Sequence, residues 1–296
     1  MSEFIKEKLR ITRIFEFNLN THKYTEHKIA GTNLATLMAL DPSNNNIWFI
    51  DPFNNDLGLY NPGNNTTQLY KIQVQGAPSG IAVDSNSTNV WLSLASANEV
   101  LRFDIQSKSF STPIKLPSTY ATPLAIIIDQ SGQIWIAESG TGKLANIDPT
   151  KNYKVSEYAP IGENNTLKSP TVLLADPTTG NIYISEHDGH AVSVFNRILK
   201  TFNQYPPLNP NGLPFGMALD NNHNPWVVEH IINKIAVIDP RTGENREINI
   251  PPVQWMTSDS QGNVWLAEER GNSLAVITST AKPSLSNSIA SQLGVG

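Results

Sequence analysis

Acidic residues recur at one kind of position in this sequence, the end of a short apolar run that begins with a large aromatic residue. They stand three positions after the aromatic residue and are Asp51, Glu138, Glu186, Glu229 and Glu268. Carboxylate oxygens suit calcium or magnesium, which could stabilise the fold or act as a Lewis acid. These five residues are therefore candidate metal ligands. The competing interpretation is structural, with each carboxylate accepting backbone N–H bonds in its own repeat.

Three histidines lie beside two of these glutamates. His187 and His190 follow Glu186 in the run Glu-His-Asp-Gly-His, and His230 follows Glu229. Imidazoles together with carboxylates could bind zinc or manganese, and His230, His187 and Glu229 are the candidate catalytic residues. Strand side chains alternate between faces, so His187 and His230 should point away from the adjacent glutamates if the strands continue. An exposed or hydrogen-bonded histidine is the competing interpretation.

The elements that position these residues belong to a repeat. An aspartate closes the first apolar run of each copy, and the copies are marked by Asp41, Asp84, Asp129, Asp176, Asp220 and Asp259. A large aromatic residue follows six or seven positions later, and these residues are Trp48, Trp91, Trp135, Tyr183, Trp226 and Trp265. A period of about 40 to 50 residues with four short strands is typical of a β-propeller blade. We expect each aromatic residue to be an apolar plug between neighbouring sheets.

The repeat predicts an all-β protein, a β-propeller with six blades of four antiparallel strands, and seven blades are the alternative. Residues 1–278 should form a single propeller that is closed by N-terminal strands at 11–29, which complete the last blade. Residues 279–296 are expected to be a flexible tail or linker. The first and second strands of a blade are antiparallel, so the acidic residues should share one face and form a ring around the central axis.

Composition excludes several classes of function. The net charge is −5 and there is no basic block, so a nucleic acid is not an expected partner. There is no cysteine, which excludes disulfides and thiolate chemistry. No apolar run reaches the roughly 18 residues of a membrane helix, so no transmembrane segment is expected. Asn-x-Ser/Thr sequences in expected loops, such as the one at Asn86, together with the tail favour an extracytoplasmic or secreted protein, with the cytoplasm as the alternative.

The residue pattern of the repeat resembles that of the streptogramin (virginiamycin B) lyase family and, more widely, that of the NHL-repeat propellers. The resemblance rests on Pro-Phe-Gly-Met-Ala-Leu-Asp at 214–220, Trp-Leu-Ala-Glu at 265–268 and Asn-Lys-Ile-Ala-Val-Ile-Asp-Pro at 233–240, and it extends from about Ile11 to Ile277. It implies a propeller with a magnesium-binding glutamate and a histidine after the proline that opens the first strand in two adjacent blades. The matching positions in this chain are Thr36, Ser79, Leu124, Thr171, Phe215 and Gln254. None is histidine, so the general base that the resemblance implies is missing.

Two hypotheses of function follow. The first is a binding or interaction module that presents the face with the glutamates to a protein, a glycan or a small-molecule ligand. The second is a metal-dependent enzyme, a C–O lyase or a lactonase-type hydrolase, that uses magnesium or calcium at the acidic ring. Metal analysis of the purified protein would discriminate between them.

Overall fold

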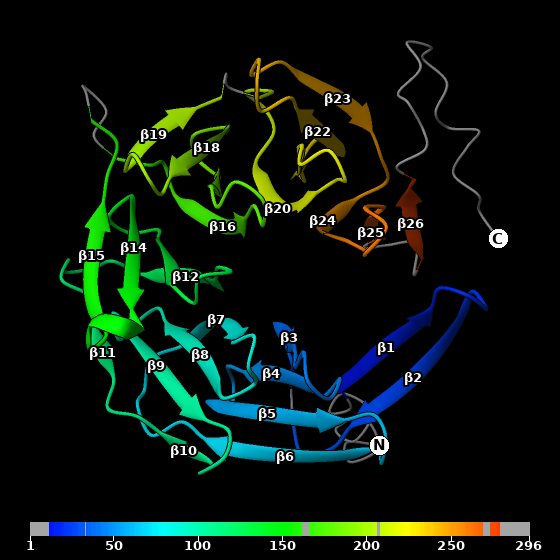
Figure 1. Cartoon of the computed structure of the whole chain (residues 1–296). Coiled ribbons are helices and arrows are strands. Elements are labelled where there is room, and N and C mark those ends of the chain that lie inside the picture. The colour runs from blue at the N-terminus through cyan, green and yellow to red at the C-terminus, as the bar shows by residue number, and fades with distance from the viewer. Residues whose placement is uncertain (1–11, 33, 162–165, 206–207, 269–272, 279–296) are drawn as a thin grey trace, which may run out of the picture. The chain divides into compact units, whose positions relative to one another are not determined.

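The computed structural model describes residues 12–32, 34–161, 166–205, 208–268 and 273–278. Apart from one 3-10 turn at Pro149–Lys151, the regular elements of these residues are all strands, β1 to β26 (Figure 1). The described part of the chain contains no helix with the length and hydropathy of a membrane span. The all-β prediction is confirmed.

Six antiparallel sheets follow one another along the chain, and each is a propeller blade. In the first three blades, the strands are β3 (Met38–Leu40), β4 (Ile47–Asp51), β5 (Asp56–Asn61) and β6 (Thr66–Lys71), then β7 (Pro78–Val83), β8 (Asn89–Leu94), β9 (Glu99–Asp104), β10 (Ser109–Phe110) and β11 (Ile114–Lys115), then β12 (Pro123–Ile128), β13 (Ile134–Glu138), β14 (Lys143–Asp148) and β15 (Lys154–Tyr158). The second blade has five strands because its outer strand is interrupted, and β10 and β11 both pair with β9.

The last three blades are built in the same order. Their strands are β16 (Pro170–Ala175), β17 (Ile182–Glu186), β18 (Ala191–Asn196) and β19 (Thr201–Gln204), then β20 (Pro214–Leu219), β21 (Pro225–Glu229), β22 (Lys234–Ile238) and β23 (Asn245–Asn249), then β24 (Val253–Ser258), β25 (Val264–Glu268) and β26 (Leu274–Ile277). The predicted fold class, a six-bladed β-propeller, is confirmed.

The chain divides into two compact units, which are described separately below. The first unit comprises the described parts of residues 1–136 and 145–157, and the second comprises those of 137–144 and 158–296. The third sheet contributes to both, since the tip of its central hairpin belongs to the second unit.

In several repeats the aspartate and the tryptophan are joined by a hydrogen bond that the sequence did not reveal. In the fifth blade, Asp220 Oδ1 accepts the N–H groups of Asn222 and Asn224, and its Oδ2 accepts the indole N–H of Trp226 at 3.1 Å. The same indole bond occurs at 2.7 Å in the third blade and at 2.9 Å in the sixth. The aspartate therefore closes the hairpin turn and also satisfies the polar atom of the buried ring, which is more than an apolar plug requires.

The Pro-x-Gly sequence that opens the second and fifth blades allows the next blade to approach. A Cβ on Gly80 would lie 2.3 Å from the backbone oxygen of Leu124 in the next blade. A Cβ on Gly216 would lie 2.4 Å from the backbone oxygen of Gln254, again in the next blade. Only glycine permits this distance between first strands.

The N-terminal strands β1 (Thr12–Asn18) and β2 (Lys23–Ile29) form a two-stranded sheet within the first unit. Their buried Ile14 and Ile29 pack with Phe49 and Tyr60 of the first blade. The last blade has three strands in the described residues, and the expected completion of that blade by the N-terminal strands stays a prediction. The expected tail at 279–296 lies outside the described residues.

Candidate functional site

The carboxylates singled out in the sequence end the second strand of their blades, and most of them are buried. Asp51 and Glu229 are 0% exposed, Glu138 is 0% exposed and Glu186 is 1% exposed, whereas Glu268 is partly exposed. Buried carboxylates need hydrogen-bond partners, and most of these partners lie in the same blade or in the loop that leads to it.

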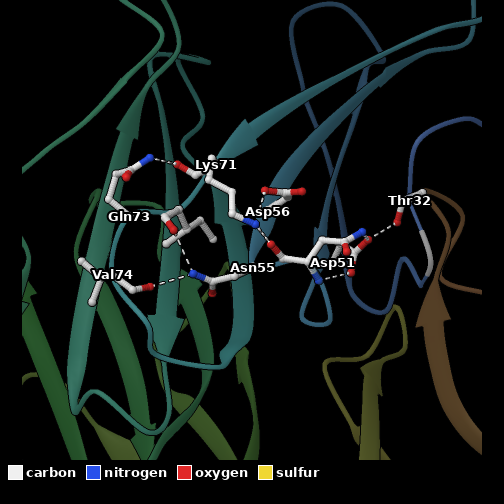
Figure 2. A network of polar contacts seen from close by, with 9 residues as sticks. Thr32, Asp51, Asn55, Asp56, Lys71, Gln73 and Val74 are labelled. Carbon is white, nitrogen blue, oxygen red and sulfur yellow. Dashed lines mark hydrogen bonds and ion pairs between the residues drawn. The ribbon is translucent and has the colours of Figure 1, made fainter.

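Asp51 belongs to the first unit and lies in a polar network at one end of the first blade (Figure 2). Its carboxylate accepts hydrogen bonds from Thr32 Oγ1 at 2.5 Å, from the backbone N–H of Asn54 at 3.0 Å and from Asn54 Nδ2 at 2.8 Å. Beside it, Lys71 pairs with Asp56 at 3.3 Å, and Asn55 Nδ2 donates to the carbonyls of Ile72 and Val74. Asp51 therefore holds the chain entering the blade and the turn after β4.

Glu186 has the most complete set of partners. Its Oε2 accepts the backbone N–H of Lys168 at 2.7 Å, and its Oε1 accepts Ser193 Oγ at 2.5 Å and Gln204 Nε2 at 2.9 Å. These three hydrogen bonds join strands β17, β18 and β19 to the loop before β16. In two other blades the corresponding glutamates accept a side-chain hydroxyl, Glu138 from Thr141 at 2.6 Å and Glu268 from Ser273 at 2.5 Å.

Glu229 has fewer hydrogen-bond partners than Glu186. Its Oε1 accepts the backbone N–H of Asn209 at 3.0 Å, but its Oε2 is buried without a hydrogen-bond partner in the described structure. The loop before β20 packs directly on the carboxylate, since a Cβ on Gly212 would lie 2.5 Å from Oε1. Burial raises the pKa of Glu229 from 4.5 to about 7, and the negative charge of Glu247 adds to the rise.

The described residues contain no group of three or more histidine, aspartate or glutamate side chains that could hold a metal ion. A metal bound by Asp51, Glu138, Glu186, Glu229 and Glu268 together stays a prediction. The hydrogen bonds given above show that these carboxylates have partners in the protein itself.

His190 has a position that recurs in the blades, the turn before the third strand. Its φ is +52°, and the equivalent turns contain Asn55, Asn98, Gly142 and Asn233, all with positive φ. In each case the backbone oxygen of this residue accepts an N–H from the segment after the fourth strand or its equivalent: Ile72, Leu116, Leu167, Leu208 or Ile250. His190 Nδ1 also interacts with the carbonyl of Gly212 at 2.5 Å, much as Asn55 and Asn98 bind carbonyls through their amides. This histidine therefore fixes the loop over Glu229.

His187 and His230, by contrast, come together in the second unit. Their Nε2 atoms are 3.4 Å apart, and their ring centroids are separated by 5.6 Å. His187 Nδ1 lies 2.9 Å from Asp188 Oδ1, and Asp188 Oδ2 accepts the hydroxyl of Ser169 at 2.5 Å. The glutamates that precede these histidines accept hydrogen bonds from other residues, Glu186 from Lys168, Ser193 and Gln204 and Glu229 from Asn209.

Two aromatic rings continue the histidine pair onto the sixth blade. The ring of Phe215 lies 6.3 Å from that of His187, 5.6 Å from that of His230 and 5.0 Å from that of Trp255. Trp255 is 42% exposed. We call these four residues, His187, Phe215, His230 and Trp255, the ring patch.

The sequence missed the two aromatic members of this patch. In the sequence, Phe215 marks only a position where the lyase resemblance implies histidine. Trp255 stands outside the repeat of buried aromatic residues and precedes Asp259 instead of following it. That difference in register is the signal that could have identified it.

Comparisons with solved structures agree on the fold. No protein-family model matches the sequence, and no curated protein sequence matches it. Among solved structures, a streptogramin B lyase is similar with a TM-score of 0.77 and 18% identity over 88% of this chain and 84% of that one. Virginiamycin B lyase from Staphylococcus aureus gives a TM-score of 0.72 and 20% identity over 82% and 80% of the two chains. A catalytically inactive variant of that enzyme with quinupristin gives a TM-score of 0.73 and 18% identity over 91% and 86%.

A further similarity is to the extracellular domain of a protein from B. thetaiotaomicron, with a TM-score of 0.62 and 17% identity over 83% of this chain and 35% of that one. The class of protein is thus a β-propeller. Within that class, the structure is streptogramin lyase-like, and the likeness expected from the sequence is confirmed at the level of the fold.

Proposed function

We propose that this protein is a ligand-binding propeller module and that the ring patch is the surface that contacts the ligand. The observation that carries the proposal is the exposed indole of Trp255 in contact with Phe215. Four of the other tryptophans are between 1% and 8% exposed. An exposed tryptophan within a cluster of rings is typical of a recognition surface, because it gives a large apolar contact area with little loss of side-chain entropy.

The same patch supports binding over proton abstraction. The lyase resemblance implies a histidine at the position of Phe215, where it would act as the general base. Here a phenylalanine ring occupies this position and packs against His187, His230 and Trp255. A phenyl ring cannot accept a proton, but it can contact an apolar part of a ligand.

The ligand class that fits the ring patch is a small molecule or peptide with an aromatic or other flat apolar group. Such a group would lie against Trp255 and Phe215, while the imidazoles would provide hydrogen bonds. Quinupristin, which accompanies the inactive lyase in a solved structure, is a suitable first probe.

The test is a titration of tryptophan fluorescence with quinupristin and with a panel of short aromatic peptides. We expect saturable quenching by at least one of these probes, and Trp255→Ala should abolish it. Tyr120→Ala is the matched control, since Tyr120 is 87% exposed and belongs to the first unit. Unchanged quenching in Trp255→Ala, or no quenching by any probe, would contradict the proposal.

Chromatography of the incubated quinupristin separates binding from catalysis. A binding module leaves the compound intact, whereas turnover would show that the protein is an enzyme. The metal-dependent alternative, a lyase or lactonase-type hydrolase at the acidic residues, is tested by elemental analysis of the purified protein and by melting with and without EDTA. No magnesium or calcium and an unchanged melting temperature would remove that alternative. An extracytoplasmic location is part of the proposal and is tested by cell fractionation.

A further inference from the structure

The two histidines of the ring patch approach each other through one particular pair of atoms. The Nε2 atoms are 3.4 Å apart while the ring planes are inclined by 35° and the centroids are 5.6 Å apart. The rings are therefore not stacked, and the ring nitrogens that face each other are the ones farthest from the backbone. Both residues occupy the same place in adjacent blades, directly after the glutamate that ends the second strand.

This separation matches the edge of a metal coordination tetrahedron. Zinc binds imidazole nitrogen at ~2.0–2.1 Å, so two nitrogens on one tetrahedral ion are about 3.3–3.4 Å apart. A hydrogen bond between two nitrogens is usually shorter, about 3.0 Å. The observed distance is thus at the long end for a hydrogen bond and suits two ligands of one ion.

A carboxylate orients the first of the two imidazoles. Asp188 Oδ1 lies 2.9 Å from His187 Nδ1, so Nδ1–H donates to the carboxylate and Nε2 carries the lone pair. Asp188 is fixed in turn by the hydroxyl of Ser169. A histidine that donates its other N–H to a carboxylate is the arrangement that holds metal ligands in orientation and raises their basicity.

We propose that His187 and His230 form an open binding site for a borderline divalent transition metal, with Zn²⁺ as the reference ion. Imidazole nitrogen favours zinc, copper and nickel, whereas magnesium and calcium favour oxygen. The described residues provide two ligands and no third of the histidine or carboxylate type, so water or a donor atom of a bound molecule fills the other positions. His190 takes no part, since its Nδ1 interacts with Gly212.

This site goes beyond the proposed function and can be tested without any organic ligand. Protein treated with EDTA and freed of it is titrated with ZnCl₂ by calorimetry. We expect one ion per chain, and both His187→Gln and His230→Gln should weaken binding at least tenfold. Asp188→Asn should weaken binding severalfold, because the tautomer of His187 is then no longer fixed. MgCl₂ should give no binding at the same concentrations.

Two controls keep the result interpretable. His22→Gln removes an exposed histidine of the first unit and should leave zinc affinity unchanged. Circular dichroism shows whether each variant is folded, and the visible absorption of Co²⁺ bound to the wild type reports whether nitrogen ligands surround the ion. Absence of zinc binding, equal affinity in either histidine variant, or affinity lost in only one of them would overturn the proposal. Trp255→Ala should abolish ligand binding but retain zinc, so the two proposals can fail separately.

Discussion

Replacement of Glu229 by glutamine tests whether the buried carboxylate is protonated in the folded protein. The side chain is 0% exposed, one oxygen accepts only the Asn209 N–H, and the other has no hydrogen-bond partner in the described residues. Glutamine has the shape of the protonated acid and carries no charge. The substitution therefore removes the ionisation while it keeps the packing against Gly212.

The size and sign of the effect follow from the pKa of Glu229, which burial and the charge of Glu247 raise from 4.5 to about 7. Between about pH 4.5 and pH 7, the folded state therefore holds a proton that the unfolded chain has already lost. The stabilisation that comes from the protonated carboxyl is fully present below pH 4.5 and is lost as the pH rises through 7. At about 1.4 kcal/mol per pKa unit, ionisation of Glu229 lowers the free energy of unfolding by about 3 kcal/mol in total.

The assay is urea unfolding of the wild type and of Glu229→Gln between pH 5 and pH 8.5 at constant ionic strength. Over this range, the free energy of unfolding of the variant should rise relative to that of the wild type by about 2–3 kcal/mol. Glu186→Gln is the matched control, because Glu186 has the same place in its blade but accepts three hydrogen bonds. The NH2 group of the glutamine would face a hydrogen-bond donor, so the free energy of unfolding of this variant should fall by about 1–3 kcal/mol. A pH-independent difference for Glu229→Gln would refute the reasoning.

Two further predictions concern the turn before the third strand. Gly142→Ala should lower the free energy of unfolding, measured with urea, by more than about 2 kcal/mol, which is roughly twice the loss expected for Gly132→Ala. Both glycines have positive φ, but a Cβ on Gly142 would lie 2.3 Å from the Leu167 oxygen, whereas one on Gly132 meets nothing within 4 Å; equal losses would contradict this account. His190→Asn should retain the melting temperature within a few degrees, because asparagine tolerates the same φ and can bind the Gly212 carbonyl, while His190→Ala should lose about 1–2 kcal/mol. Similar melting temperatures for the two His190 variants would show that the side-chain contact has no structural role.

The repeat could be identified from the sequence because the residues that define it make hydrogen bonds that few other residue types can make. An aspartate that accepts both turn N–H groups and an indole N–H, as Asp220 does, cannot be replaced by a residue of another type without loss of a buried hydrogen bond. Aspartate and tryptophan therefore recur at fixed spacing, and four strands per period led directly to the propeller. Strand ends were located well enough to place the acidic residues correctly.

The turn before the third strand could not be predicted from the sequence. This turn needs a backbone conformation with positive φ, which several residue types can adopt. Asn55, Gly142 and His190 differ in chemistry, yet all have positive φ and give a carbonyl to the segment that follows the fourth strand. His190 therefore appeared in the sequence as a third imidazole of a metal cluster. Its conformation and its contact with Gly212 assign it to the scaffold.

Glu186 and Glu229 show why position in a repeat does not determine chemistry. Both end the second strand of a blade and both are buried. The loop before β16 and the strands of that blade give Glu186 three donors, whereas the loop before β20 gives Glu229 one N–H and covers the rest with Gly212. Each loop gives one N–H, so the two donors that Glu229 lacks are those on strands, Ser193 of β18 and Gln204 of β19. The surroundings of a repeated carboxylate thus depend on which residues the neighbouring strands of its own blade carry. If this is correct, Ala236→Ser, which places a hydroxyl at the position equivalent to Ser193, should reduce the pH dependence assigned to Glu229 in the same urea titration. An unchanged pH dependence in this folded variant would contradict the argument.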